Sequence, residues 1–254
     1  MRVAVTGGTG FIGRALVRAL LERGDEVRVV TRKRGRHGLK HPNLTESTWE
    51  ELNERPELLE GTHAIVNLAG ETINQRWTKA AKDRVLKSRL DAAGAAANWV
   101  QAMRDKPVVV NASGISYYGM SETDTFDERS PGRVTDFLSA VVKEWEEAAD
   151  RIPARRLIKL RIGLVLGADG GAFPLMVLPY RLFVGGRVGC ARPSGVADLL
   201  DAAGRPHGVV AATSEANHRH RLTSARAVRQ LAGGGVAAPG NAPTANDEDR
   251  RESQ

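Results

Sequence analysis

The segment Arg2-Val-Ala-Val-Thr-Gly-Gly-Thr-Gly-Phe-Ile-Gly13 opens the sequence, and in it a short β-branched run passes directly into a cluster of glycines. Apolar residues then recur at helical spacing over residues 14–23, and residues 26–30 have the pattern of a second strand. A strand, a glycine turn, a helix and a strand within about 30 residues form a βαβ unit. The pattern predicts an α/β protein with a doubly wound parallel sheet.

The glycines of this turn have the spacing of a dinucleotide fingerprint. Gly7 permits the tight turn, Gly10 lets the backbone approach a pyrophosphate, and Gly13 lets the helix lie close to the strand. The free N–H groups of the first helical turn then favour an anion by about 0.3–2 kcal/mol. An ordinary glycine-rich turn is the alternative. We expect a Rossmann-type domain whose cofactor-binding turn consists of Gly7, Thr9, Gly10, Phe11, Ile12 and Gly13.

The end of the second predicted strand indicates which dinucleotide is bound. NAD-preferring proteins of this fold usually carry a carboxylate there, but this chain has Thr31-Arg-Lys-Arg34. A guanidinium at Arg32 can form a forked contact with a 2′-phosphate, and a charge-assisted hydrogen bond of about 1.5–3 kcal/mol gives roughly a tenfold to hundredfold preference. We therefore predict NADP rather than NAD, with a solvated basic loop as the alternative.

The α/β pattern continues after a weakly patterned region at residues 37–61. Strands are predicted at 64–70, 108–113 and 157–166, a long helix at 78–104 with Leu86, Leu90, Ala93 and Ala97 on one face, and a further helix within 131–151. Ligands bind beyond the carboxyl ends of such strands. Leu68, Ala69 and Gly70 are accordingly expected beside the cofactor.

Composition narrows the class of protein. Of 254 residues, 41% are hydrophobic and 26% are charged, which is typical of a globular chain. The net charge of +7 comes from scattered basic residues and aromatics are only 5%, so nucleic-acid binding is the least favoured function. The single cysteine, Cys190, precludes an intramolecular disulfide, and no zinc-ligand spacing occurs. We find no secretory signal or long apolar run and expect a cytoplasmic protein without a membrane span.

Several further motifs occur in a fixed order. They are Asn67-Leu-Ala-Gly-Glu71, Arg76-Trp-Thr78, Ser88-Arg89, Tyr117-Tyr-Gly119, Phe126-Asp-Glu-Arg-Ser-Pro131, Trp145-Glu146, Arg161-Ile-Gly-Leu-Val-Leu-Gly167 and Gly185-Gly-Arg-Val-Gly189. With the glycine turn, they make residues 1–189 resemble the atypical extended short-chain dehydrogenases/reductases, epimerase-family NAD(P)-binding oxidoreductases of unknown substrate. The resemblance implies an NADP-binding domain with Thr31 and Arg32 at the 2′-phosphate, Leu68 and Ala69 near the adenosine half, and Arg89 reaching the cofactor from the long helix.

The catalytic residues of related reductases are missing. Those enzymes pair a tyrosine with a lysine four residues later, because the ammonium lowers the pKa of the phenol. Here the corresponding helix reads Phe137-Leu-Ser-Ala-Val-Val-Lys143. Ser113, at the end of a strand, and Tyr118 remain as candidates for polarising a substrate carbonyl. The alternatives are a cap or turn hydroxyl for Ser113 and a packing role for Tyr118.

The composition changes at residue 190. Residues 190–254 contain no aromatic, isoleucine, methionine or lysine, and residues 233–254 have the composition of a disordered segment. We divide the chain into a nucleotide-binding domain at 1–189 and a divergent, partly disordered tail at 190–254, with short helices at most at 196–203 and 224–231. Our hypothesis is a frameshift near residue 190, which leaves the substrate lobe incomplete or aberrant. The histidines of the tail are expected on the surface rather than at a metal.

Two functions follow from these observations. The first is an NADP-dependent oxidoreductase or epimerase-like protein that acts on a small carbonyl or alcohol. The second is a catalytically silent NADP-binding sensor or regulatory protein. The missing tyrosine–lysine pair favours the second function, and the polar strand exit from Ser113 to Tyr118 favours the first.

Overall fold

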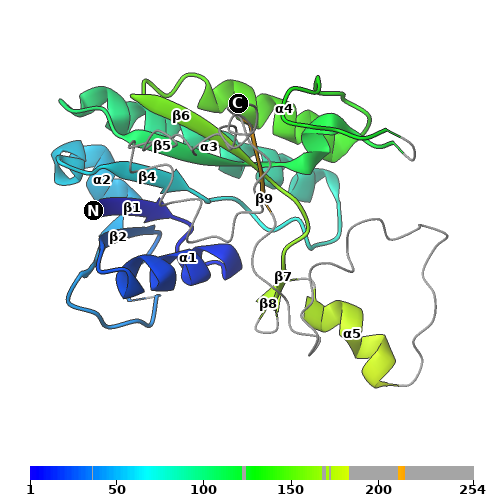
Figure 1. The fold of residues 1–254 in the computed structure, drawn as a ribbon, viewed down its shortest axis with the longest axis horizontal. Coiled ribbons are helices and arrows are strands. Elements are labelled where there is room, and N and C mark those ends of the chain that lie inside the picture. Colours follow the sequence, from blue (N-terminus) through cyan, green and yellow to red (C-terminus); the bar gives the residue numbers. More distant parts are fainter. Residues whose placement is uncertain (36, 122–123, 168–169, 172, 183–210, 215–254) are drawn as a thin grey trace, which may run out of the picture.

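A seven-stranded sheet with helices on both faces organises the chain (Figure 1). The computed structural model describes residues 1–35, 37–121, 124–167, 170–171, 173–182 and 211–214. The strand order is β3-β2-β1-β4-β5-β6-β9, in which β1 to β6 are parallel and β9 is antiparallel to β6. The order 3-2-1-4-5-6 is that of a doubly wound nucleotide-binding sheet, so the predicted Rossmann-type fold is confirmed.

The first half of the sheet is built around the glycine turn. Strand β1 (Arg2–Thr6) leads through the turn into α1 (Phe11–Glu22), and β2 (Glu26–Thr31) returns parallel to β1. Helix α1 begins three residues earlier than the apolar spacing predicts, because the glycine turn itself supplies its first turn. Its apolar side chains pack with those of β1 and β2 on one face of the sheet.

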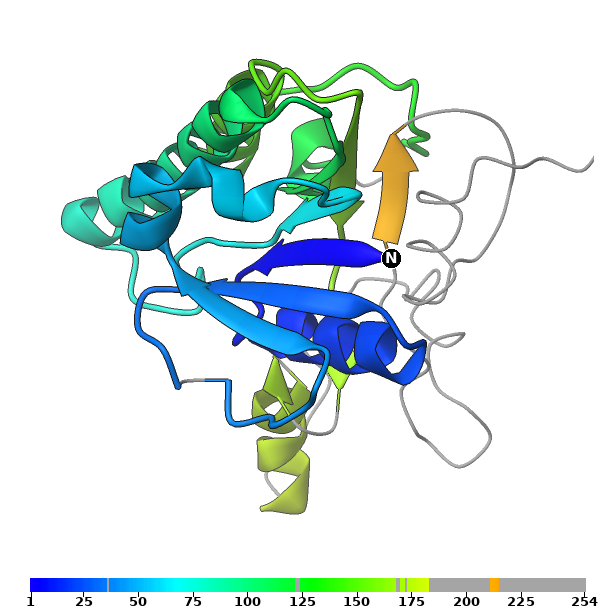
Figure 2. The same ribbon diagram turned by 90° about the vertical axis from the view of Figure 1, so that its left-hand side faces the viewer.

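The second half of the sheet carries the longer helices. Strands β4 (Ala64–Asn67), β5 (Val108–Gly114) and β6 (Arg156–Ile162) alternate with α3 (Lys79–Ala102) and α4 (Phe137–Ala149). A short 3-10 helix, η2 (Ile115–Tyr118), follows β5 directly. Figure 2 shows α1 on one side of the sheet and α3 and α4 on the other. This arrangement leaves the carboxyl ends of β1, β2 and β4 open to a ligand.

The weakly patterned region 37–61 contains three elements that the sequence did not predict. They are β3 (Leu44–Thr48), α2 (Trp49–Glu54) and the 3-10 helix η1 (Pro56–Leu59). Strand β3 lies at the sheet edge and is largely polar, so it lacks an apolar period. Helix α2 starts at a capping box, in which the Thr48 hydroxyl accepts from the Glu51 N–H and the Glu51 carboxylate accepts from the Thr48 N–H.

The predicted apolar face of the long helix is partly right. Of its four residues Ala93 is fully buried, whereas Leu86, Leu90 and Ala97 are only partly buried. Helix α3 also buries Val85, Ala92, Ala96 and Trp99. Small alanines form most of this face, and alanine gives little contrast in hydropathy. The buried side of the helix therefore does not include its two leucines.

The last described segments form a hairpin, one helix and one strand. A hairpin of β7 (Leu166–Gly167) and β8 (Gly170–Gly171) precedes α5 (Phe173–Arg181), and β9 (Ala211–Ser214) lies in the segment that we expected to be divergent. The short helices predicted at 196–203 and 224–231, the disordered segment at 233–254 and the tail histidines lie outside the described residues. No described helix has the length and apolar character needed to cross a membrane.

Candidate functional site

The glycine turn after β1 is shaped by close backbone contacts. Gly7 has a φ of +67°, and a Cβ there would lie 2.6 Å from the Leu68 carbonyl oxygen. A Cβ on Gly13 would lie 2.2 Å from the Gly7 oxygen, whereas one on Gly10 would meet that oxygen at 3.2 Å. Gly7 and Gly13 are thus required by the turn itself, as predicted. The free surface at Gly10 faces the cleft, where its role towards a pyrophosphate stays a prediction.

The N-terminus of α1 is open to an anion. Gly10 is the N-cap, no side chain caps the helix, and its first turn contains no acidic residue. By contrast, Thr48, Thr78 and Asp136 cap α2, α3 and α4 through their side chains. The first-turn N–H groups of α1 are consequently available to a phosphate at the positive end of the helix dipole.

The basic segment after β2 is held in place by its neighbours. The Thr31 hydroxyl donates to the Lys33 carbonyl at 2.6 Å and accepts from the Lys33 N–H at 3.0 Å. Arg34 forms an ion pair with Glu51 at 2.7 Å, and this contact and the Thr48 N–H lower the pKa of Glu51. Arg32 is exposed, and within the described residues no carboxylate pairs with it. A free guanidinium therefore lies at the end of β2.

These features border a cleft of about 570 Å³. Its lining comes from the glycine turn, the ends of β2 and β4, α2 and the middle of α3, namely Gly7, Thr9, Gly10, Val30, Thr31, Arg32, Trp49, Glu50, Asn53, Leu68, Ala69, Gly70, Glu71, Ser88, Asp91, Ala92 and Ala95. The structure thus brings most of the predicted cofactor residues together. Within the described chain, Phe11, Ile12, Gly13 and Arg89 are not part of this lining.

Two of those four residues have other contacts. The Phe11 ring lies against the β7–β8 hairpin, where a Cβ on Gly171 would be 2.7 Å from the ring. Arg89 donates to the carbonyls of Glu71 and Val85 and lies 5.0 Å over the Trp145 ring. Burial lowers the pKa of Arg89. Arg89 thus supports the loop that follows β4, and direct contact with a cofactor stays a prediction.

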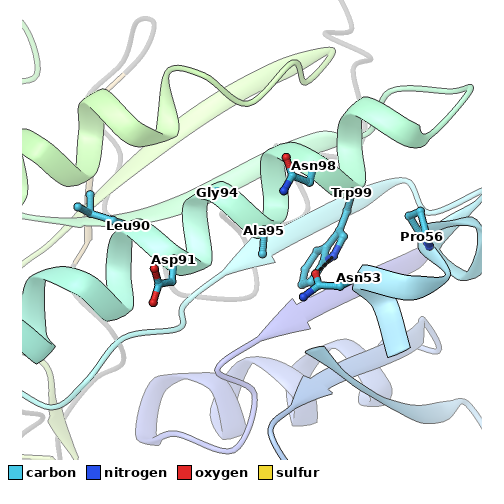
Figure 3. A pocket seen from close by; sticks show the side chains of 8 residues that line it. All are labelled: Asn53, Pro56, Leu90, Asp91, Gly94, Ala95, Asn98 and Trp99. Atoms are coloured by element: carbon cyan, nitrogen blue, oxygen red, sulfur yellow. Dashed lines mark hydrogen bonds between the residues drawn. The ribbon is translucent and has the colours of Figure 1, made fainter. Parts of the chain in front are cut away.

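A second groove of about 630 Å³ adjoins the cleft along the outer surface of α3 (Figure 3). It shares Asn53, Asp91 and Ala95 with the cleft. The Trp99 indole donates to the Asn53 side chain at 2.8 Å, and the rings of Trp99 and Trp49 are 5.1 Å apart. Asn53 and Trp49 are thereby fixed at the α2 wall of the cleft.

A row of buried polar side chains crosses the sheet beneath the cleft. The Thr6 hydroxyl donates to Asn67 at 2.6 Å, and the Asn67 amide donates to Asn111 at 2.6 Å. The Ala69 N–H donates to the Thr6 hydroxyl at 3.3 Å. Because these residues are paired in register on β1, β4 and β5, the row fixes the strand ends against which a ligand would lie.

The candidate catalytic residues Ser113 and Tyr118 belong to one buried network. Ser113 donates to Glu146 at 2.5 Å, and Arg161 donates to the same carboxylate through Nε at 2.9 Å and Nη2 at 3.0 Å. Arg161 also donates to the Tyr118 hydroxyl at 2.9 Å. Burial alone would lower the pKa of Arg161, but its hydrogen bonds to Glu146 and Tyr118 raise it. In the described chain, neither hydroxyl lines the cleft.

Aromatic rings enclose this network. Arg161 stacks on Tyr117, with the guanidinium carbon 3.5 Å from the ring centroid, and Tyr118 stacks on Phe126 at 5.3 Å. Sequence reasoning did not assign a site role to Glu146 or Arg161. Both lie in the ordered motifs Trp145-Glu146 and Arg161-Ile-Gly, but their spacing does not indicate that they pair.

The described residues contain no group of histidine, cysteine, aspartate or glutamate side chains arranged to hold a metal ion. The site therefore consists of a glycine turn, an uncapped helix and a guanidinium around one cleft.

Comparison with known proteins identifies the family. The sequence model described as the NAD dependent epimerase/dehydratase family matches residues 3–137, more than half of the chain. Epimerase family protein SSP1921 of Staphylococcus saprophyticus is 36% identical over 191 residues, which cover 74% of this chain and 63% of that protein. Human epimerase family protein SDR39U1 is 39% identical over 230 residues, covering 87% of this chain and 72% of the human one.

A solved structure agrees with the sequence matches. The crystal structure of human epimerase family protein SDR39U1 (isoform 2) with NADPH superposes with a TM-score of 0.66 at 42% identity. The match covers 75% of this chain and 63% of that one. The chain thus spans slightly less than two thirds of the Staphylococcus relative and of the human crystal structure. The fold, the glycine turn and these matches together show that the chain belongs to the NAD dependent epimerase/dehydratase family.

Proposed function

We propose that the chain binds NADP(H) in the cleft and acts as an oxidoreductase or epimerase-like protein on a small carbonyl or alcohol. The observation that carries this proposal is Arg32, an unpaired guanidinium at the rim of a cleft whose other side is the Gly7–Gly13 turn. The NADPH in the human relative's structure supports the choice of nucleotide. The expected cytoplasmic location and small-molecule partner belong to the same proposal.

The residues around the cleft fit a nicotinamide dinucleotide. The N–H groups at the start of α1 would hold the pyrophosphate, and Thr31 and Arg32 the 2′-phosphate. Leu68 and Ala69 would lie along the adenosine half. When bound, the nicotinamide ring supplies the hydride donor or acceptor.

Titration with NADPH and NADH tests the nucleotide assignment. We expect Arg32→Ala to weaken NADPH binding about tenfold to a hundredfold and to change NADH binding little. Arg34→Ala is the matched control, because that guanidinium is already paired with Glu51 and the loss should be much smaller. Equal losses for both nucleotides in Arg32→Ala would contradict the 2′-phosphate site.

The second candidate is a catalytically silent NADP-binding sensor. It is favoured by the segment Phe137–Lys143, which lacks the tyrosine–lysine pair of related reductases, and by the buried contacts of the Ser113 and Tyr118 hydroxyls. A panel of small aldehydes and ketones added to the NADPH complex separates the two functions. Loss of NADPH absorbance supports the oxidoreductase, whereas tight binding without oxidation supports the sensor.

A further inference from the structure

The loop between β4 and α3 holds a tryptophan at the surface in a fixed position. The Trp77 indole N–H donates to the Ile73 carbonyl at 2.9 Å, and the Gln75 amide donates to the Thr72 carbonyl at 2.6 Å. The loop thus satisfies the one polar group of the ring, and 46% of Trp77 is nevertheless exposed. The exposed part of this side chain is an apolar, aromatic surface with a set orientation.

Two side chains from different helices complete an aromatic and cationic cluster around Trp77. Phe137, the first residue of α4, lies 5.7 Å from the Trp77 ring at an interplanar angle of 64°. The Lys82 ammonium, from the first turns of α3, lies 5.0 Å over the Phe137 ring. Among the described residues, no carboxylate is within ion-pair distance of Lys82, whereas Lys87 on the same helix pairs with Asp91. Lys82 therefore offers an uncompensated positive charge beside the Phe137 ring.

The cluster lies on elements that follow β4 and β5 in the chain, whereas the basic segment follows β2. The loop that holds Trp77 starts at Gly70 and Glu71, which line the cleft. The Arg84 guanidinium lies 3.9 Å from the Glu71 carboxylate and donates to the Gln75 side-chain oxygen at 3.2 Å. In the sheet order, β4 and β2 are on opposite sides of β1. With the adenosine half over β2 and the pyrophosphate at α1, the nicotinamide half extends over β4 and β5. Trp77 and Lys82 follow β4 in the chain and Phe137 begins the helix that follows β5, so we place the cluster beside this half.

We propose that Trp77, Phe137 and Lys82 form a substrate subsite for a planar aromatic group that carries a carboxylate next to the reacting carbonyl, as in an aryl 2-oxo acid. This inference rests on the proposed function. The rings provide an aromatic surface, and the ammonium attracts an anion and repels a cation. An aryl 2-oxo acid combines both features, an aromatic ring and a carboxylate, in one small molecule.

Calorimetric titration of the full chain bound to NADP⁺ tests the subsite through binding rather than turnover, because the oxidised coenzyme cannot reduce the probe. The probe is benzoylformate, with pyruvate as the analogue without a ring and methyl benzoylformate as the analogue without a charge. We expect saturable binding of benzoylformate, with each analogue at least about tenfold weaker. Pyruvate or the ester binding as tightly as benzoylformate would overturn the subsite, as would the absence of benzoylformate binding.

Variants assign the effect to the named side chains. Lys82→Gln should weaken benzoylformate about fivefold to tenfold and leave the methyl ester unchanged, and Trp77→Leu should weaken both aromatic compounds. Lys87→Gln is the control and should change neither Kd, because this exposed ammonium is already paired. An equal effect of Lys82→Gln and Lys87→Gln would overturn the assignment of the charge.

A separate NADPH titration distinguishes failure of the subsite from failure of the proposed function. If NADPH binds normally and benzoylformate does not bind, the subsite is wrong and the nucleotide site stands. If neither binds, both proposals are wrong.

Discussion

Replacing Gly13 by alanine has two opposing effects on the free energy of unfolding, a gain in helix propensity and a loss from steric overlap. Gly13 is in helix α1, so alanine propensity alone predicts a gain of about 0.8–1.0 kcal/mol. The added Cβ would, however, lie 2.2 Å from the Gly7 oxygen and 2.7 Å from the Gly8 Cα. The atoms must separate by roughly 1 Å, and such overpacking costs about 1–3 kcal/mol. Because these neighbours are backbone atoms, we expect the cost in the upper part of that range and a net loss of about 1–2 kcal/mol in the free energy of unfolding.

The same substitution at Gly94 is the matched control. Gly94 is also helical, in α3, but nothing lies within 4 Å of a Cβ built there. Gly94→Ala should therefore gain up to about 1 kcal/mol, which raises the Tm by roughly 2–4 °C. Urea unfolding followed by circular dichroism compares the two variants, and NADPH titration should show at least about tenfold weaker binding for Gly13→Ala alone. If Gly13→Ala is as stable as Gly94→Ala and binds NADPH normally, the turn does not depend on this contact.

Three further predictions concern the described chain. Glu146→Gln should lower the free energy of unfolding by about 3 kcal/mol in urea, because it leaves Arg161 buried at 5% exposure without its carboxylate, and adding Arg161→Met should restore part of this loss. Burial lowers the pKa of His37, so the unfolded chain takes up a proton first as the pH falls. The free energy of unfolding should then decrease from pH 7 to pH 5, and this decrease should be smaller in His37→Gln than in the control His41→Gln, which replaces an exposed side chain. Asp136→Ala should cost about 1 kcal/mol in thermal unfolding because it removes the N-cap of α4, and an unchanged Tm would contradict that role.

The parts of the fold that were predictable are those set by local backbone constraints. Gly7 and Gly13 are forced by contacts within the βαβ unit, so their spacing predicts the turn and the sheet class. Strand β3 was not predictable, because a strand at the sheet edge can be largely polar and then shows no alternation of apolar and polar residues. The buried face of α3 was predicted only at Ala93 for a related reason, since alanines form most of this face and only the tertiary contacts with the sheet define it.

The residues of the candidate site also differ in whether local sequence or tertiary contacts determine their positions. Arg32 was predictable because its neighbours in sequence place it at the end of β2, in the position where the fold reads the ribose. The pairing of Glu146 with Arg161 joins α4 to β6, and no spacing rule predicts which charged residues of these elements meet. The polar row from Thr6 to Asn111 depends likewise on strand register.

The buried network bears on how a carbonyl could be reduced at this site. Hydride transfer to a carbonyl carbon leaves an oxygen that must receive a proton. The Ser113 hydroxyl is already donating to Glu146, whereas the Tyr118 hydroxyl accepts from Arg161 and keeps its own proton. Both side chains are buried, and among the described residues that line the cleft neither is present. The segment Phe137–Lys143 contains no tyrosine. Turnover therefore requires either that one of these hydroxyls reach the cleft or that another donor such as water supply the proton, and a chain that does neither retains nucleotide binding without catalysis.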